Sequence, residues 1–405
     1  MRPFATLCLG IFLIACHASD RSAGAQTGDP VETRPPNAAN QQPAFAGQTR
    51  APGVRTNQAM VSEVVVSGLE HPWAVTPLSE REFLVTERPG RLRVVTSAGD
   101  IGLPIRGLPQ VFAEGQGGLL DVELSPTFAE DRLIYWSYAE PREGGAGTAV
   151  ARGRLSGDQT RVDNVEVIFR AEPTFNNGMH FGSRLVFDRE GRLYVTLGER
   201  SSMETRAQAQ ALDSHFGKIV RINAAGSVPA DNPFVGRDDA RPEIWSLGHR
   251  NVQGAALHPD TGALWSIEHG ARGGDEINIP APGANYGWPV VAYGIEYRGG
   301  PIGEGRTAGE GFETPVYYWD PVIAPGGAVF YQGDMFPGWR GDLLVSGLAG
   351  RHLARLVLDG ERVVGEERLL TDLGERIRDV AVAADGAVWV VTDDADGKLV
   401  RLAAR

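Results

Sequence analysis

Residues 184–197, RLVFDREGRLYVTL, hold the pattern on which the fold prediction depends. An apolar run, a polar turn containing Asp and Gly, and a second apolar run follow one another without a helical period. Short runs of Val, Leu and Tyr bounded by turn residues are typical of β-strands. The stretch therefore predicts a β-hairpin.

The same pattern occurs six times beyond residue 60. Its copies lie at 74–86, 121–138, 184–197, 254–268, 327–347 and 379–392. Their irregular spacing does not suit a solenoid, but it suits propeller blades joined by loops of varying length. We predict an all-β chain with one domain over residues 61–405, a six-bladed β-propeller with four-stranded blades. A pair of β-sandwiches is the alternative, although no interdomain linker interrupts the body.

The two ends of the predicted propeller complement each other. The last copy offers three strands, at 380–383, 388–392 and 399–403, so a four-stranded blade lacks one. Residues 62–66, SEVVV, precede the first copy and are a suitable fourth strand. Pairing this N-terminal strand into the last blade closes the ring and removes exposed sheet edges.

Composition excludes several classes of protein. The 405 residues include 39 basic and 51 acidic side chains, for a net charge of −12, and only two Cys. A chain this long buries a large core without disulfides, and its negative charge disfavours nucleic acid and anionic lipid as partners. We expect a monomer without a nucleic-acid partner.

The N-terminus has the features of an export signal. Residues 1–15 hold one basic residue and a short apolar run, as in a signal peptide. The run ends Leu13-Ile14-Ala15-Cys16, which resembles a bacterial lipobox, so we expect an acylated Cys16 and a periplasmic, lipid-anchored protein of the cell envelope. Cleavage after residues 23–25, AGA, is the alternative. Residues 16–60 have no apolar periodicity and are predicted to be a disordered linker.

Polar residues gather just before the first strand of four predicted blades. They are Gln116; His180; Arg250, Asn251 and Gln253; and Arg376 and Arg378. Equivalent positions of successive blades face one channel, so these groups predict a cationic, amide-lined pocket for a ligand with several carboxylates or phosphates. The alternative is that the arginines lie on the rim of a chain in which Arg is frequent, and that the histidine is a buried core residue.

A further cluster combines carboxylates with glycines. Residues 268–278 read EHGARGGDEIN and residues 283–289 read GANYGWP. Carboxylates and free carbonyl groups are the ligands that Ca²⁺ prefers. The alternative is that these Asp, Asn and Gly residues only form ordinary turns, in which the same residue types are common.

Taken in order, these motifs resemble the PQQ-dependent soluble sugar dehydrogenases, of both the glucose and the aldose sugar type. The resemblance covers nearly all of residues 64–402. It implies a six-bladed propeller that oxidises aldose sugars at C1 to the lactone, with PQQ and Ca²⁺ as cofactors and an electron acceptor that the sequence does not identify.

The resemblance also implies a role for each residue of the pocket. His180 would be the general base for the sugar hydroxyl, and Arg250 would stabilise the negative charge that grows on the quinone oxygen. The residues matching the family's cofactor contacts are Gln116, Arg250, Asn251, Gln253, Arg376 and Arg378.

Metal and sugar contacts follow from the same resemblance. Backbone carbonyls of Gly270 and Ala271 would hold a Ca²⁺ that polarises the quinone. Trp319 matches the aromatic wall for the sugar. A second, structural Ca²⁺ would be bound by Glu276, Tyr286, Ala292 and Glu296.

The chain departs from the family at three points. Ala349 replaces a lysine that contacts the cofactor, and Arg351 is its candidate substitute. Met179 stands where the glucose-type enzymes have an acid, and Arg200 stands where they have a glutamine. These changes affect cofactor affinity and sugar specificity but leave the proposed base in place.

Two other functions are compatible with a propeller. One is a Ca²⁺-dependent lactonase or esterase, which would need Asn, Asp and Glu rather than Arg around the channel. The other is a non-catalytic binding propeller that lost its chemistry together with the lysine.

Overall fold

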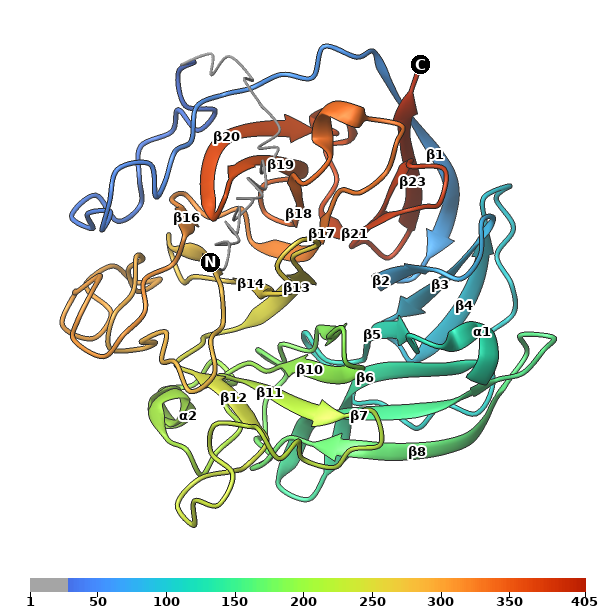
Figure 1. Cartoon of the computed structure of the whole chain (residues 1–405), viewed down its shortest axis with the longest axis horizontal. Helices are drawn as coiled ribbons and strands as arrows, with labels where there is room; N and C mark the ends of the chain where they lie inside the picture. The colour runs from blue at the N-terminus through green and yellow to red at the C-terminus, as the bar shows by residue number, and fades with distance from the viewer. Residues whose placement is uncertain (1–27) are drawn as a thin grey trace, which may run out of the picture.

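The computed structural model describes residues 28–405, and these residues form six antiparallel sheets arranged in a ring about a central axis (Figure 1). The all-β, six-bladed prediction is confirmed. The stretch 184–197 forms β9 (Leu185–Phe187) and β10 (Arg192–Thr196). Its turn is closed by hydrogen bonds from Asp188 N to Arg192 O and from Gly191 N to Asp188 O.

The remaining strands are given blade by blade, from the channel outward. The first three blades are β2 (Pro72–Pro77), β3 (Glu82–Glu87) and β4 (Arg91–Thr96); β5 (Leu119–Leu124), β6 (Leu133–Arg142), β7 (Gly145–Leu155) and β8 (Val162–Arg170); and β9, β10, β11 (Lys218–Asn223) and β12 (Ile244–Leu247). The last three are β13 (Val252–Leu257), β14 (Leu264–Glu268), β15 (Asp275–Asn278) and β16 (Tyr317–Trp319); β17 (Pro325–Phe330), β18 (Leu343–Gly347), β19 (His352–Asp359) and β20 (Arg362–Leu369); and β21 (Ile377–Val382), β22 (Val388–Thr392), β23 (Gly397–Ala404) and β1 (Met60–Leu69). The described helices are short: α1 (Phe128–Asp131), α2 (Met203–Arg206), and the 3₁₀ turns η1 (Ala207–Gln210), η2 (Pro337–Trp339) and η3 (Thr371–Leu373).

The ring closes as predicted. β1 pairs antiparallel with β23, with Met60 opposite Ala404 and Val64 opposite Val400, so the N-terminal strand is the outer strand of the last blade (Figure 1). Apolar side chains of neighbouring blades meet between the sheets: Phe83 of the first blade packs 4.6 Å from Trp389 of the last, between ring centroids. The closing contact is therefore both a strand pairing and a packed core.

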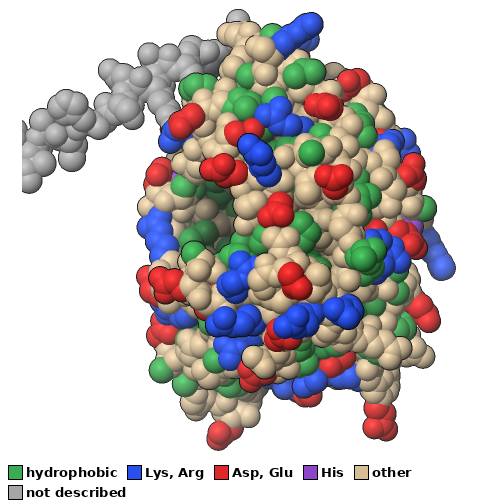
Figure 2. Space-filling view, turned by 90° about the vertical axis from the view of Figure 1, so that its right-hand side faces the viewer, with side chains coloured by type: hydrophobic (Ala, Val, Ile, Leu, Met, Phe, Trp, Pro, Cys, Tyr) green, Lys and Arg blue, Asp and Glu red, His purple; other side chains and the backbone are tan. Residues whose placement is uncertain are grey.

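The first blade differs from the prediction because it has three strands. Beside β4 the chain continues as an irregular segment, in which Gly102 N donates to Val94 O and Ile105 N donates to Leu92 O. Pro104 has no N–H to donate and Gly102 weakens a strand, so the segment covers the edge without forming a fourth strand. On the side of the molecule seen in Figure 2, acidic and basic side chains are interspersed.

A buried ion-pair cluster crosses the middle of the channel. Arg184 places Nη1 2.8 Å from Asp121 and Nη2 2.9 Å from Asp379, and its Nε donates to the Gln253 carbonyl. Asp379 also accepts a hydrogen bond from Val75 N. This cluster connects the innermost strands of several blades.

The prediction of a disordered linker over residues 16–60 is wrong for its described part. Residues 28–59, which we call the N-terminal strap, lie along the blade of β17–β20 (Figure 1). The Asp320 carboxylate accepts hydrogen bonds from Asn37 N and Ala38 N, and Glu367 accepts from Thr56 N and Oγ1. The polar strap is ordered by hydrogen bonds to the propeller rather than by a core of its own. The predicted signal peptide and residues 16–27 lie outside the described residues.

Gln48 is the most deeply buried polar anchor of the strap. Its side chain is fully buried, donates to the Pro315 carbonyl at 2.6 Å and accepts from Ala44 N at 2.7 Å. Removing the amide leaves the buried Pro315 carbonyl and the Ala44 N–H without this partner. We expect Gln48→Ala to lower the free energy of unfolding by about 1–3 kcal/mol in urea titrations. Gln42→Ala, on an exposed residue of the same strap, is the control and should leave it nearly unchanged; equal stability of the two variants would contradict this account of the strap.

Within residues 28–405, none of the helices has the length and apolar character needed to cross a membrane.

Candidate active site

The polar clusters predicted at the blade starts converge at one mouth of the channel. His180 N donates to Gln116 Oε1 at 2.9 Å, and Gly182 N donates to Asn251 Oδ1 at 3.1 Å. Arg378 Nη1 donates to Gln253 Oε1 at 2.7 Å. Loops before β5, β9 and β13 and the start of β21 thus contribute to one pocket, as predicted.

His180 is held in a conformation unusual for a residue with a side chain. Its φ of 47° lies in the left-handed region, and its side chain is 5% exposed. The neighbouring loop approaches closely, since a Cβ at Gly198 would lie 2.3 Å from the His180 carbonyl oxygen. Backbone strain of this kind persists where surrounding structure fixes it, and it is common at functional sites.

The His180 ring is oriented by Glu199. Nδ1 lies 3.0 Å from Glu199 Oε1, while Oε2 of the same carboxylate accepts from Ser201 N. Burial, followed by the nearby Arg250, lowers the pKa of His180 to about 4, although the Glu199 carboxylate acts in the opposite direction. The ring is therefore neutral near pH 7. With its Nδ1 hydrogen on Glu199, it presents the unprotonated Nε2 that a general base needs.

Arg250 and Arg378 supply the positive charge of the pocket. Arg250 Nη1 donates to the carbonyls of His269 and Gly270, and its guanidinium lies 5.2 Å from the centre of the Trp288 ring. Arg378 Nη2 lies 3.1 Å from Asp393. Both side chains are buried, and the Nε of each has no hydrogen-bond partner among the described residues. Buried donors without partners fit an anionic ligand that would complete their hydrogen bonds.

His269 belongs to the same pocket, although the sequence analysis gave it no role. Its Nε2 lies 3.1 Å from Gln253 Oε1. Burial together with Arg378, Arg250 and His180 keeps the pKa of His269 well below its usual value. Its only signal in the sequence was its position after Glu268 in the glycine-rich stretch. The role of Glu199 was also missed, and its signal was a carboxylate directly after a strand.

The other cationic residues lie at the rim. The Arg376 side chain is 44% exposed, and its Nη2 lies 3.4 Å from Asp393. Arg351 donates to the Gly374 carbonyl, and Ala349 is exposed. The structure therefore gives Arg378 a central position and Arg376 a peripheral one, while the Arg351 guanidinium is engaged by the Gly374 carbonyl.

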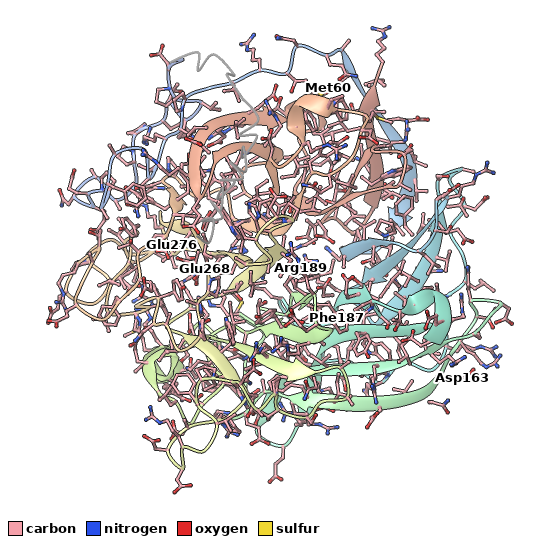
Figure 3. All side chains as sticks on the ribbon, viewed as in Figure 1. Met60, Asp163, Phe187, Arg189, Glu268 and Glu276 are labelled. Carbon is pink, nitrogen blue, oxygen red and sulfur yellow. The ribbon has the colours of Figure 1, made fainter. Side chains whose placement is uncertain are left out.

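A small cavity lies beside Arg250, and most of the predicted metal ligands line it. Glu268 and Glu276 are directly opposite each other on β14 and β15 (Figure 3). The wall residues that match the metal prediction are Gly270, Ala271, Glu276, Tyr286 and Ala292.

The carboxylates of this cavity fit a cation. Glu268 already accepts from His249 Nδ1, Arg250 N and Asn278 Nδ2. Among the described residues, Glu276 accepts a hydrogen bond from Asn278 Nδ2 alone, at 3.3 Å. Burial and the neighbouring Glu268 raise the pKa of Glu276 well above its usual value, so a bound cation would relieve an unfavourable site. Within residues 28–405, no three His, Cys, Asp or Glu side chains form a metal cluster, so backbone carbonyls would supply much of the coordination.

The structure places two of the predicted site residues outside the pocket. Glu296 forms an ion pair with Arg206 and does not line the cavity. Trp319 is 3% exposed and packs in the core against Tyr317, with Nε1 3.3 Å from Glu366 Oε2, so it is not a wall for a sugar. One residue lies on a loop and the other on an outer strand, and the local sequence does not determine which way these side chains point.

The fold and the pocket together define a class: a propeller whose channel mouth combines a neutral histidine base with incompletely paired arginines. Comparison with known proteins makes the class specific. The family model described as Glucose / Sorbosone dehydrogenase matches residues 69–401. The chain belongs to this family.

Individual relatives agree with the family. The chain is similar to the aldose sugar dehydrogenase YliI of Escherichia coli (strain K12), with 45% identity over 85% of this chain and 92% of that protein. A crystal structure of a glucose dehydrogenase is 51% identical, with a TM-score of 0.83, over 85% of this chain and 100% of that one. The PQQ-bound form of an aldose sugar dehydrogenase from Streptomyces coelicolor is 27% identical, with a TM-score of 0.71, over 87% of this chain and 100% of that one.

The lowered pKa of His180 makes a prediction about pH. A base must be unprotonated, so kcat/KM for the reaction that His180 serves should fall only as pH decreases through about 4, and not near 6.5. In Glu199→Gln the carboxylate that raises the pKa of His180 is gone, so the pH at which kcat/KM falls on the acidic side should be lower than in the wild type. We also expect kcat to fall at least about tenfold, because the ring loses the partner that fixes its tautomer. A pH–rate profile of both proteins measures this, and an unchanged profile in Glu199→Gln would exclude the orienting role.

Proposed function

We propose that the chain is a PQQ- and Ca²⁺-dependent dehydrogenase that oxidises aldose sugars at C1 to the lactone. The observation that carries the proposal is the pairing of a neutral His180, whose Nδ1 is occupied by Glu199, with Arg250 and Arg378, whose Nε atoms have no described partner. A proton acceptor and an unfilled cationic pocket are what hydroxyl oxidation with an anionic cofactor needs.

The residues of the pocket would divide the work as follows. His180 Nε2 takes the proton of the C1 hydroxyl, and Gln116 fixes the His180 backbone through its N–H. Arg250 and Arg378 bind the carboxylates and oxygens of the cofactor, with Asn251 and Gln253 beside them. Bound PQQ would supply the quinone that accepts the hydride from C1. The sugar thereby loses one proton and one hydride, and its C1–O bond becomes a carbonyl.

Ca²⁺ would occupy the cavity that Arg250 lines. Glu276, Tyr286 and Ala292 line this cavity together with Gly270 and Ala271, whose backbone carbonyls would hold the Ca²⁺ that polarises the quinone. Because Arg250 Nη1 donates to Gly270 O, a cation there would share or displace this contact. The acylation of Cys16 and a location in the cell envelope remain part of the proposal and rest on the sequence of residues 1–16.

The proposal is tested by reconstitution. Protein freed of cofactors is incubated with PQQ and Ca²⁺, and glucose oxidation is followed with an artificial electron acceptor. We expect turnover that requires PQQ and is lost when Ca²⁺ is chelated before PQQ is added. Hydrolysis of a lactone without PQQ, and no sugar oxidation with it, would contradict the proposal.

A further inference from the structure

The two ends of the innermost strands carry different side chains. The candidate active site is built from residues that precede or begin these strands, such as His180 before β9, Arg250 before β13 and Arg378 in β21. The other ends of the same strands line a second cavity of about 450 Å³, which we call the distal cavity. Every blade contributes to it, with residues such as Val75, Leu124, Phe187, Ala256, Val329 and Val382. The two sites therefore lie at opposite ends of the central axis.

The lining of the distal cavity is apolar except for four residues, and three of these four are paired. The Thr76 hydroxyl donates to the Val122 carbonyl at 2.6 Å. Arg184 and Asp379 pair with each other, with Nη2 2.9 Å from the carboxylate oxygen. Neither side chain needs a ligand to complete this contact. The fourth polar residue is Glu123.

Glu123 has no side-chain partner. Among residues 28–405, no side chain forms a hydrogen bond or an ion pair with its carboxylate. Its charged form is favoured by the backbone N–H of the adjacent Leu124 and by Arg184, whose guanidinium already pairs with Asp121 and Asp379. Burial, followed by the neighbouring Asp121, raises the pKa of Glu123 to about 8. The cavity thus contains a carboxylate without a counter-charge of its own.

The charges around Glu123 do not balance. Arg184 carries one positive charge, whereas Asp121, Glu123 and Asp379 together can carry three negative ones. Among the described residues, no Lys and no second Arg lines the cavity. A ligand that brings a positive charge to Glu123 would offset the excess, because a buried charge is stable when it is paired.

The apolar lining defines the rest of the ligand. Ca²⁺ takes about 6–8 oxygen ligands, and the side chains of this cavity offer few. An ammonium group on an apolar body suits the cavity better, since the ammonium pairs with the carboxylate and the body covers the apolar ends of the strands. Small-molecule sites commonly combine an apolar wall with a few polar groups that fix the orientation of the ligand.

We propose that the distal cavity binds a small organic cation, with an ammonium group against Glu123 and an aliphatic or aromatic body against the ends of the six innermost strands. The inference goes beyond sugar oxidation and does not rest on it. It assigns a second ligand site to the end of the propeller opposite His180.

The test is a calorimetric titration with hexylammonium in the presence of PQQ and Ca²⁺, on protein that begins at residue 28. At a pH of about 8.5 the amine keeps its proton while Glu123 can lose its own. We expect saturable binding of one hexylammonium per chain with a Kd below about 1 mM. Hexanol has the same body without the charge, and it should bind at least about tenfold more weakly because it cannot neutralise the carboxylate.

A variant locates the binding. Glu123→Gln keeps the size of the side chain and removes its charge, so its Kd for hexylammonium should rise at least about tenfold while its Kd for hexanol stays within about twofold. Glu130→Gln, on an exposed carboxylate of α1, is the control and should keep the wild-type Kd for both. The melting temperature of each variant verifies that it is folded.

Three results would overturn the inference: no saturable binding of hexylammonium by the wild type up to about 10 mM, equal affinity for hexanol, or an unchanged Kd in Glu123→Gln. The comparison of hexylammonium with hexanol in the wild type tests the charge preference even if the variant does not fold. Uptake of PQQ and bleaching by glucose are measured separately, so the failure of either proposal leaves the other standing.

Discussion

His180→Ala should lose at least about a hundredfold in kcat while still binding PQQ. General base catalysis contributes about this much, and no other described imidazole lies in hydrogen-bond contact with Glu199. Because the side chain is small and lies beside the channel, its removal leaves the arginines in place. The measurement is steady-state sugar oxidation together with a PQQ titration of the same preparation.

His258→Ala is the matched control for this variant. His258 lies at the turn between β13 and β14, away from the mouth, where Nδ1 accepts from Asp260 N. We expect it to retain wild-type turnover. Undiminished turnover in His180→Ala would show that another group removes the proton, and loss of PQQ binding would show that His180 serves the cofactor instead.

Arg250→Ala should lower PQQ affinity at least about thirtyfold. Its guanidinium is buried, contacts the carbonyls of His269 and Gly270, and lies over Trp288, so truncation removes both charge and packing from the centre of the pocket. Loss of one partner from a buried charge interaction costs about 2–5 kcal/mol. Titration of the protein with PQQ, followed by the quinone spectrum, gives the affinity.

Variants of two further arginines provide comparisons for the PQQ affinity of Arg250→Ala. Arg376→Ala should have a smaller effect than Arg250→Ala, because Arg376 is largely exposed and its contact to Asp393 is long. Arg237→Ala, in an exposed pair with Asp239, should have none. A larger loss for Arg376→Ala than for Arg250→Ala would contradict the position that the structure gives to the two side chains.

Much of the fold could be predicted because its signals are local. Each hairpin, such as β9 with β10, needs only apolar runs and a turn, and the count of copies gave the number of blades. The pairing of β1 into the last blade could be predicted because the last copy of the pattern has one strand too few for a four-stranded blade. The N-terminal strap could not be predicted, because its order depends on carboxylates such as Asp320 and Glu367, which lie 283 and 311 residues further along the chain than the groups they bind.

The site was predictable to a similar extent. Residues at the starts of innermost strands converge in any propeller, so His180, Arg250 and Arg378 could be grouped from sequence. Trp319 and Glu296 could not be placed, since all residues of β16 are buried and the partner of Glu296 is Arg206 of α2, 90 residues earlier in the chain. The strap also has a practical consequence: a protein that begins at residue 61 loses it, so the experiments need a chain that includes residue 28.

The most direct test of the central claim is a PQQ titration with and without Ca²⁺, followed by addition of glucose. The account predicts Ca²⁺-dependent binding, a higher melting temperature of the bound protein, and bleaching of the quinone absorbance when glucose is added. Absence of PQQ binding at every Ca²⁺ concentration, or binding with no bleaching by any aldose, would contradict it.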